Sequence, residues 1–290
     1  MPWVFVLIWS TGFVVARLGM PHAPPLHFLC WRYALSVVCL GLWMRCANLP
    51  WSVSPQQWPH LAVCGVLMHA GYLGGVWFAV KGGLSPGMAA LIVGLQPVLT
   101  AVWVAWSGSH RVAGRQWLGL MLGLGGVTLV VWHKLGVAAG LHAEVLWAIV
   151  LALASITAGT LYQKRFVEPS DWRCANLLQL AAALAVSLPI ALFEDGVMQW
   201  HAELIGALAW SVLILTLAGS SLLMLLIHRG AATQVTSLMY LVPPTTALMA
   251  WMLFGEAITL TVLIGMALCA AGVLLVMQAS SQAAVLPQGP

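Results

Sequence analysis

Long apolar runs, separated by short stretches that contain Pro, Gly or charge, extend along the whole chain. A helix needs about 20 apolar residues to cross a bilayer. The hydropathy pattern predicts ten such helices, near residues 2–20, 27–47, 57–80, 84–107, 115–133, 143–165, 173–194, 204–228, 231–254 and 258–279. The longest predicted connections, 48–56, 134–142 and 195–203, leave no room for a separate water-soluble domain.

Composition agrees with an all-α polytopic membrane protein in a lipid bilayer. Hydrophobic residues make up 62% of the 290 positions and charged residues 6%, against roughly 45–50% and about 25% in soluble domains. A net charge of +4 is spread too thinly for a nucleic-acid surface. The six cysteines lie singly within apolar runs without metal-ligand spacing, so we expect no metal and no cofactor.

The distribution of basic residues predicts the orientation. With the N-terminus in the cytoplasm, the connections on that side collect Arg45, Arg111, Arg115, Lys164, Arg165, Arg173 and Arg229. The opposite side keeps Arg17, Lys81 and Lys134. By the positive-inside rule, both termini are expected in the cytoplasm.

An internal repeat appears when the chain is aligned with itself at a shift of 146 residues. Residues 90–97 then fall on 236–243, and Gly119 and Gly126 fall on Gly265 and Gly272. We predict a first repeat at 1–133, a connecting loop at 134–142, a second repeat at 143–279 and a disordered cytoplasmic tail at 280–290. Because five helices per repeat is an odd number, the second repeat is inverted in the membrane, an architecture typical of secondary carriers.

Several motifs of the chain, taken in order, resemble those of a known protein family. The segment 7–17, LIWSTGFVVAR, is followed by Pro24-Pro25-Leu26 and Trp31-Arg32-Tyr33, and SPGMAA at 85–90 runs into Gln96-Pro97. Leu253-Phe-Gly-Glu256 precedes Gly265 and Gly272. This series resembles EamA-type carriers of the drug/metabolite transporter superfamily over nearly the whole chain.

The resemblance implies a ten-helix inner-membrane carrier that exports small organic metabolites, commonly amino acids. The opening motif and Leu95-Gln96-Pro97 are most similar to the aromatic amino acid exporters of that superfamily. One departure is Ser109-His110 in the first repeat, where the second has Gly255-Glu256.

Polar residues inside predicted spans are candidates for the substrate pathway, because ionisable groups in lipid are costly unless they face protein or water. His69 and Tyr72 share one helix face; the alternative for His69 is a neutral ring bonded to a neighbouring helix. The residues predicted to line the pathway are His69, Tyr72, Gln96, Thr100, Trp103, Gln234, Ser237, Tyr240 and Arg32. Pro97, Pro243 and Pro244 are expected to break two helices at equivalent depths, as hinges or as static bends.

Two arginines are candidates to bind a substrate carboxylate, since a guanidinium offers paired donors. Arg32 lies within the second predicted helix, whereas Arg17 lies near the end of the first, where its side chain can instead extend to the lipid headgroups.

Small residues recur on the fifth and tenth helices. They are Gly119, Gly123 and Gly126, and Gly265 and Gly272. Such faces allow close helix packing within one chain, the interpretation we favour, or dimerisation. The expected oligomeric state is accordingly a monomer or a homodimer.

Carboxylates are confined to span ends and connections, which argues against an ion-coupled antiporter with a buried acid. We therefore expect facilitated transport or weak proton coupling through His69. No H-E-x-x-H or G-x-S-x-G motif occurs, so an intramembrane hydrolase is not expected. The open alternatives are export of amphipathic drugs or of other metabolites such as nucleotide precursors, and a non-transporting membrane scaffold.

Overall fold

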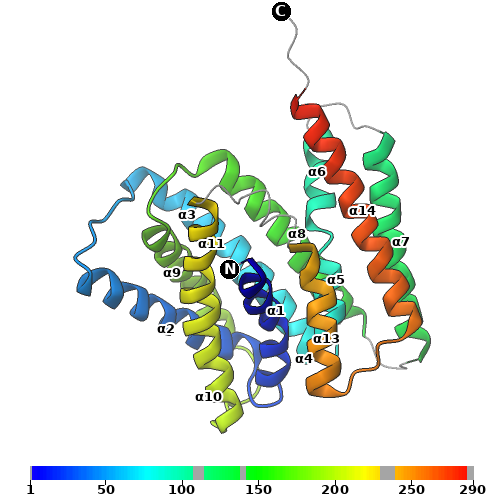
Figure 1. The fold of residues 1–290 in the computed structure, drawn as a ribbon. Coiled ribbons are helices and arrows are strands. Elements are labelled where there is room, and N and C mark those ends of the chain that lie inside the picture. The colour runs from blue at the N-terminus through cyan, green and yellow to red at the C-terminus, as the bar shows by residue number, and fades with distance from the viewer. Residues whose placement is uncertain (1, 107–113, 138–141, 229–238, 286–290) are drawn as a thin grey trace, which may run out of the picture.

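The structure, a computed structural model, describes residues 2–106, 114–137, 142–228 and 239–285 (Figure 1). The helices of the first half are α1 (Pro2–Gly19), α2 (Pro25–Cys46), η1 (Pro55–Gln57), α3 (Trp58–Gly65), η2 (Val66–Gly71), α4 (Tyr72–Lys81), α5 (Pro86–Val93), α6 (Gln96–Trp106) and α7 (Gly114–Val137). Those of the second half are α8 (Ala143–Phe166), α9 (Trp172–Ala191), α10 (Ala202–Ala209), η3 (Trp210–Gly219), α11 (Ser220–His228), η4 (Met239–Leu241), α13 (Val242–Phe254) and α14 (Leu260–Val285).

These elements form ten helical spans, which confirms the predicted all-α polytopic architecture. Five continuous helical stretches are long and apolar enough to cross a membrane, and five shorter apolar helices accompany them. The third span consists of α3, η2 and α4, the fourth of α5 and α6, and the eighth of α10, η3 and α11. α14 continues to Val285, into the segment 280–290 for which a disordered tail was expected; 286–290 lie outside the described residues.

The helix contacts follow the internal repeat. Three spans pack against their own equivalents in the other repeat: α2 on α9, α5 on α13, and α7 on α14. Two further contacts are also reciprocal: the third span packs on the sixth through α4 and α8, and the first packs on the eighth through α1, α10 and η3. Figure 1 shows α7 and α14 side by side along their length. This pairing is what a two-fold relation between two inverted repeats requires.

Both repeats also carry the same irregularity. The third and eighth spans, which are equivalent in the repeat, each contain a π-helical stretch, at η2 and at η3. π-helical turns are rare and occur often at functional sites. Hydropathy alone did not predict either stretch.

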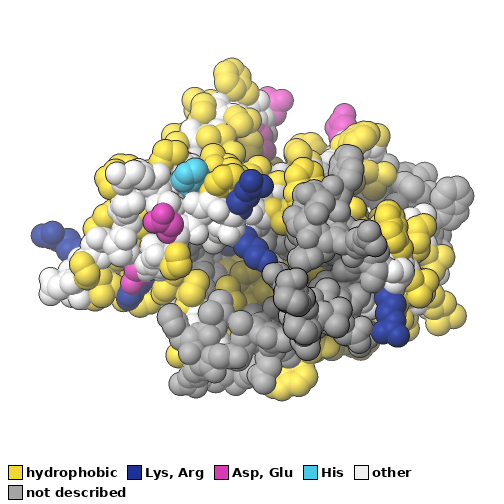
Figure 2. Space-filling model, turned by 90° about the horizontal axis from the view of Figure 1, so that it is seen from above, with side chains coloured by type: hydrophobic (Ala, Val, Ile, Leu, Met, Phe, Trp, Pro, Cys, Tyr) yellow, Lys and Arg dark blue, Asp and Glu magenta, His cyan; other side chains and the backbone are white. Residues whose placement is uncertain are grey.

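The outer surface suits lipid. Large side chains such as Trp147 and Met252 remain 72% and 69% exposed. Figure 2, which looks down on the upper end of Figure 1, shows both hydrophobic and charged side chains at this end of the molecule. Burial is concentrated where the two repeats meet, in a core that includes Tyr33, Trp77, Leu91 and Ile149.

Candidate substrate pathway

A cluster of polar and aromatic side chains lies between α2, η2 and α4. The Tyr33 hydroxyl donates a hydrogen bond of 2.9 Å to the backbone carbonyl of His69, and the two rings are 6.3 Å apart edge to face. The Cζ atom of Arg32 lies 5.5 Å from the centre of the Trp77 ring. His69 and Tyr72 are partly exposed, whereas Arg32 is only 8% exposed. Three predicted pathway residues, Arg32, His69 and Tyr72, therefore belong to one cluster.

Glycines set the position of this cluster. A Cβ atom at Gly65 would clash with the carbonyl oxygen of Gln179 on α9, and one at Gly75 would lie 2.5 Å from the carbonyl oxygen of Ala148 on α8. A Cβ atom at Gly71 would lie 2.7 Å from the Ser155 hydroxyl. The third span thus approaches α8 and α9 at backbone distance, as small residues permit in membrane bundles.

A second polar group joins α6 to α8. The Gln96 side-chain amide donates to the Thr160 hydroxyl at 2.8 Å, and the Thr100 hydroxyl donates to the Gln96 carbonyl at 2.9 Å. Trp103, further along α6, is 57% exposed. Gln96 therefore faces a neighbouring helix, Thr100 bonds to the backbone of its own helix, and Trp103 faces the surface.

The predicted helix breaks occur next to the prolines, not at them. α5 ends at Val93, α6 starts at Gln96, and Pro97 lies in the first turn of α6. Pro243 and Pro244 likewise lie in the first turn of α13, after η4. Because proline fits the first turn of a helix, each proline starts a new helical segment. A Cβ atom at Gly94 would lie 3.3 Å from Pro243 Cγ, so the two equivalent breaks contact each other.

Three of the predicted pathway residues have no described side chain. Gln234 and Ser237 lie outside the described residues, and Tyr240 belongs to η4 without a described side chain.

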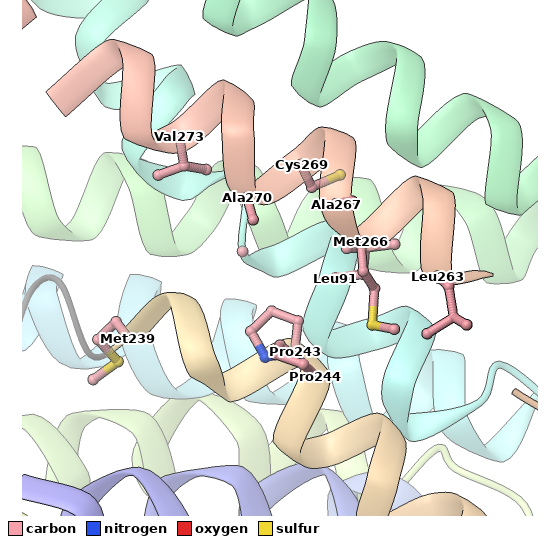
Figure 3. A pocket seen from close by; sticks show the side chains of 11 residues that line it. Leu91, Met239, Pro243, Pro244, Leu263, Met266, Ala267, Cys269, Ala270 and Val273 are labelled. Atoms are coloured by element: carbon pink, nitrogen blue, oxygen red, sulfur yellow. The ribbon is translucent and has the colours of Figure 1, made fainter. Parts of the chain in front are cut away.

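An apolar cavity borders these breaks (Figure 3). It has a volume of about 290 Å³ and lies between α5, α13 and α14. It is lined by Leu91, Gly94, Met239, Pro243, Pro244, Leu263, Met266, Ala267, Cys269, Ala270 and Val273. Of the predicted pathway and hinge residues with described side chains, only the prolines of α13 contribute to this lining.

The predicted glycine faces meet each other between α7 and α14. A Cβ atom at Gly126 would lie 2.6 Å from the Gly265 carbonyl oxygen, and one at Gly272 would clash with the Gly119 carbonyl oxygen. Cys269 Sγ lies 3.4 Å from the Gly123 carbonyl oxygen, to which it donates. In the structure these faces pack within the chain.

The sequence did not predict four residues of the two polar groups, the one around Arg32 and His69 and the one around Gln96. These residues are Tyr33, Trp77, Thr160 and Gln179. Gln179 is 7% exposed on α9 and lies beside His69. A signal was available for Gln179 and Thr160, because each is a polar residue in the middle of an apolar run.

Ten membrane spans in two inverted repeats, with polar groups buried where the repeats meet, define the architecture of a membrane transporter. The model of the EamA-like transporter family matches the chain twice, at residues 3–132 and 143–278. The chain therefore belongs to the EamA-like transporter family, and it is a multi-pass membrane protein.

Relatives with curated names are similar over most of their length. A probable amino-acid metabolite efflux pump of Salmonella typhimurium is 25% identical over 92% of this chain and 90% of the relative. The uncharacterized transporter YvbV of Bacillus subtilis is 25% identical over 93% and 88%. The uncharacterized inner membrane transporter YedA of Escherichia coli is 26% identical over 87% and 81%. A solved crystal structure of a protein covers 97% of both chains with a TM-score of 0.65 at 21% identity, a likeness of fold.

Proposed function

We propose that this carrier exports small organic metabolites, with amino acids, aromatic ones included, as the leading substrate class. The observation that carries the proposal is the cluster of Arg32, Tyr33, His69 and Tyr72 on α2, η2 and α4 of the first repeat, which pack on α8 and α9 of the second. Two relatives named as probable amino-acid metabolite efflux pumps, in Salmonella typhimurium and Escherichia coli, support the same class.

The proposed mechanism is alternating access. The helix breaks before Pro97 and Pro243 contact each other between the repeats, which suits hinges on which one repeat rocks against the other. His69, Tyr72, Gln96 and Thr100 are the proposed pathway residues on described segments. The second repeat contributes three further proposed pathway residues, Gln234, Ser237 and Tyr240. Among the proposed pathway residues with described side chains, Trp103 lies nearest the surface.

The proposal also covers coupling and location. Transport is facilitated or weakly proton-coupled through His69, because His is the side chain whose ordinary titration falls near neutral pH. The protein resides in the inner membrane with both termini in the cytoplasm, as a monomer or a homodimer. It catalyses no chemical reaction.

The test is uptake into liposomes that contain the purified protein, with labelled amino acids, a nucleoside and two cationic drugs. We expect saturable uptake of amino acids that survives collapse of the pH gradient, and its loss in His69→Asn. The matched control is His201→Asn, since His201 is exposed on the connection before α10. Uptake of the drugs or the nucleoside alone would replace the substrate class, and loss of uptake on collapse of the gradient would assign proton coupling.

A further inference from the structure

Arg32 is a buried cation without an anionic partner among the described residues. It is 8% exposed, and its Nε and Nη1 atoms have no hydrogen-bond acceptor there. The ion pairs of the described residues join His22 to Glu203, His27 to Glu194, and Arg173 to Asp171. None of them involves Arg32.

Two further donors near Arg32 are also buried without a partner in the described part of the chain. They are the indole Nε1 of Trp77, whose ring lies 5.5 Å from Arg32 Cζ, and the hydroxyl of Ser36. Ser36 is four residues after Arg32 on α2, so the two side chains share one helix face. An unpaired buried donor lowers the stability of the protein, and a charged one lowers it more. The cluster therefore combines a positive charge with several unsatisfied N–H and O–H groups.

The surroundings of Arg32 define what can satisfy it. The Trp77 ring interacts with the guanidinium as in a cation–π contact, which leaves the N–H groups, directed outward in the guanidinium plane, free to donate. Aromatic side chains of Tyr33 and Tyr72 lie beside it. A ligand here must supply acceptor oxygens and negative charge next to aromatic walls, and a carboxylate is the group that matches a guanidinium in shape and charge.

We propose that Arg32, with Trp77 and Ser36, forms the subsite for the substrate's carboxylate, and that the transported compounds are therefore carboxylic acids. This inference rests on the proposed export of small metabolites and narrows its substrate class. The positive charge of the subsite disfavours cationic compounds that lack a carboxylate. Arg32 is buried in this conformation, so the proposal requires it to become accessible during the transport cycle. The adjacent π-helical turn at Val66–Gly71 is an irregular element of the kind that occurs often at functional sites.

The experiment compares compounds that differ only in the carboxylate. Liposomes with the intact protein are offered labelled phenylalanine and leucine, their carboxamides, and the corresponding decarboxylated amines. We expect the acids to be transported at least about 30-fold faster than the amides and amines, a factor that corresponds to about 2 kcal/mol, since the amides and amines leave the buried charge unpaired. In Arg32→Gln, uptake of the acids falls by a similar factor.

Three variants separate recognition from folding. Arg32→Lys retains the charge without the paired donors, so it should fall between the wild type and Arg32→Gln. Trp77→Phe retains the ring and removes Nε1, so it should weaken uptake of the acids severalfold. Arg45→Gln is the matched control, because Arg45 is exposed in the last turn of α2, the same helix, and it should transport the acids normally. Size-exclusion profiles establish that each variant is folded; if Arg32→Gln aggregates, Trp77→Phe and the acid-to-amide ratio of the wild type decide.

The outcomes distinguish the two proposals. Equal transport of acids, amides and amines by the wild type would overturn the carboxylate subsite and leave export of metabolites standing. Unchanged uptake of acids by folded Arg32→Gln would do the same. No uptake of any compound would overturn both.

Discussion

At the scale of single residues, a hydrogen in place of a methyl group decides how closely α7 and α14 approach. Gly126 faces α14, where an added Cβ would meet the Gly265 carbonyl oxygen at 2.6 Å and Cys269 Sγ at 2.8 Å. Its neighbour Gly125 faces open space, with nothing within 4 Å of an added Cβ. The two adjacent glycines therefore have different roles, and packing requires a glycine only at Gly126.

This difference predicts that Gly126→Ala destabilises the protein and Gly125→Ala does not. Overpacking at a close contact costs about 1–3 kcal/mol, whereas alanine at an open helical position is neutral or slightly stabilising. Thermal unfolding of both variants in detergent measures the difference. Equal midpoints for the two variants would show that α7 and α14 do not pack through Gly126.

At the scale of elements, acidic side chains act at the ends of helices. The Glu194 carboxylate, from the connection after α9, accepts hydrogen bonds from the backbone N–H groups of Leu26 and His27 at 2.9 and 3.2 Å. These groups belong to the first turn of α2, whose N-terminus favours negative charge. The connection is thereby attached to the start of the helix that carries Arg32.

Asp171 has the equivalent role for α9. Its carboxylate accepts from the backbone N–H of Arg173 at 2.8 Å and from the Arg173 guanidinium at 2.9 and 2.6 Å. The hydrogen bond from the Arg173 side chain is the main reason why the pKa of Asp171 is lowered below its usual value. Asp171 is partly exposed, so its contribution is that of a helix cap with a surface ion pair.

The lowered pKa of Asp171 predicts a pH-dependent stability difference between the wild type and Asp171→Asn. A carboxylate whose folded-state pKa is depressed stabilises the fold above its unfolded pKa of about 3.9, and this contribution is lost as pH falls through the folded-state pKa. Asparagine can still cap the helix, so we expect the variant to be less stable only by the charge contribution, up to about 1 kcal/mol at neutral pH. The gap should close below about pH 4.

Thermal midpoints measured from about pH 7 to about pH 3 test this prediction. The control is Glu168→Gln, since Glu168 is exposed on the same connection and its removal should leave the midpoint unchanged at every pH. A gap between the wild type and Asp171→Asn that stayed constant down to the lowest pH would contradict a role of the Asp171 charge.

The sequence predicted helices well and the irregular turns poorly. Apolar runs predicted the ten spans because lipid imposes a length and a composition on each helix. The π-helical stretches were missed because Val66–Gly71 and Trp210–Gly219 are as apolar as their flanks. The break before Pro97 was placed at the proline itself, since a mid-run proline fits a kink as well as the first turn of a new helix.

The candidate site was only partly predictable for a related reason. His69 and Arg32 stood out because ionisable residues are rare within spans. Tyr33 and Trp77 did not, since aromatic residues are common in membrane helices and only the fold brings Trp77 against Arg32. Which helices face each other depends on side-chain packing over long sequence separations, and a single sequence does not record it.

At the scale of the whole molecule, the contact between α5 and α13 joins the two repeats. A Cβ atom at Gly87 would lie 3.2 Å from Ala247 Cβ. Gly87 is in the first turn of α5, which follows the connection 82–85, so this contact lies towards the end of the molecule where that connection is found. The repeats contact each other there, and the proposed alternating access predicts that this contact opens during transport.

Cysteines at Gly87 and Ala247 should therefore lock the transporter when they are oxidised. In a background from which the six native cysteines are removed, a small shift brings the two Cβ atoms into the disulfide range of about 3.5–4.5 Å. The cross-linked protein should lose transport, since the repeats can no longer separate at this contact, and a reductant should restore it. Uptake into liposomes, with the cross-linked fraction measured by mass spectrometry, provides the comparison. Full transport by a quantitatively cross-linked protein would mean that the substrate crosses without separation of α5 and α13, and it would remove this contact from the transport cycle.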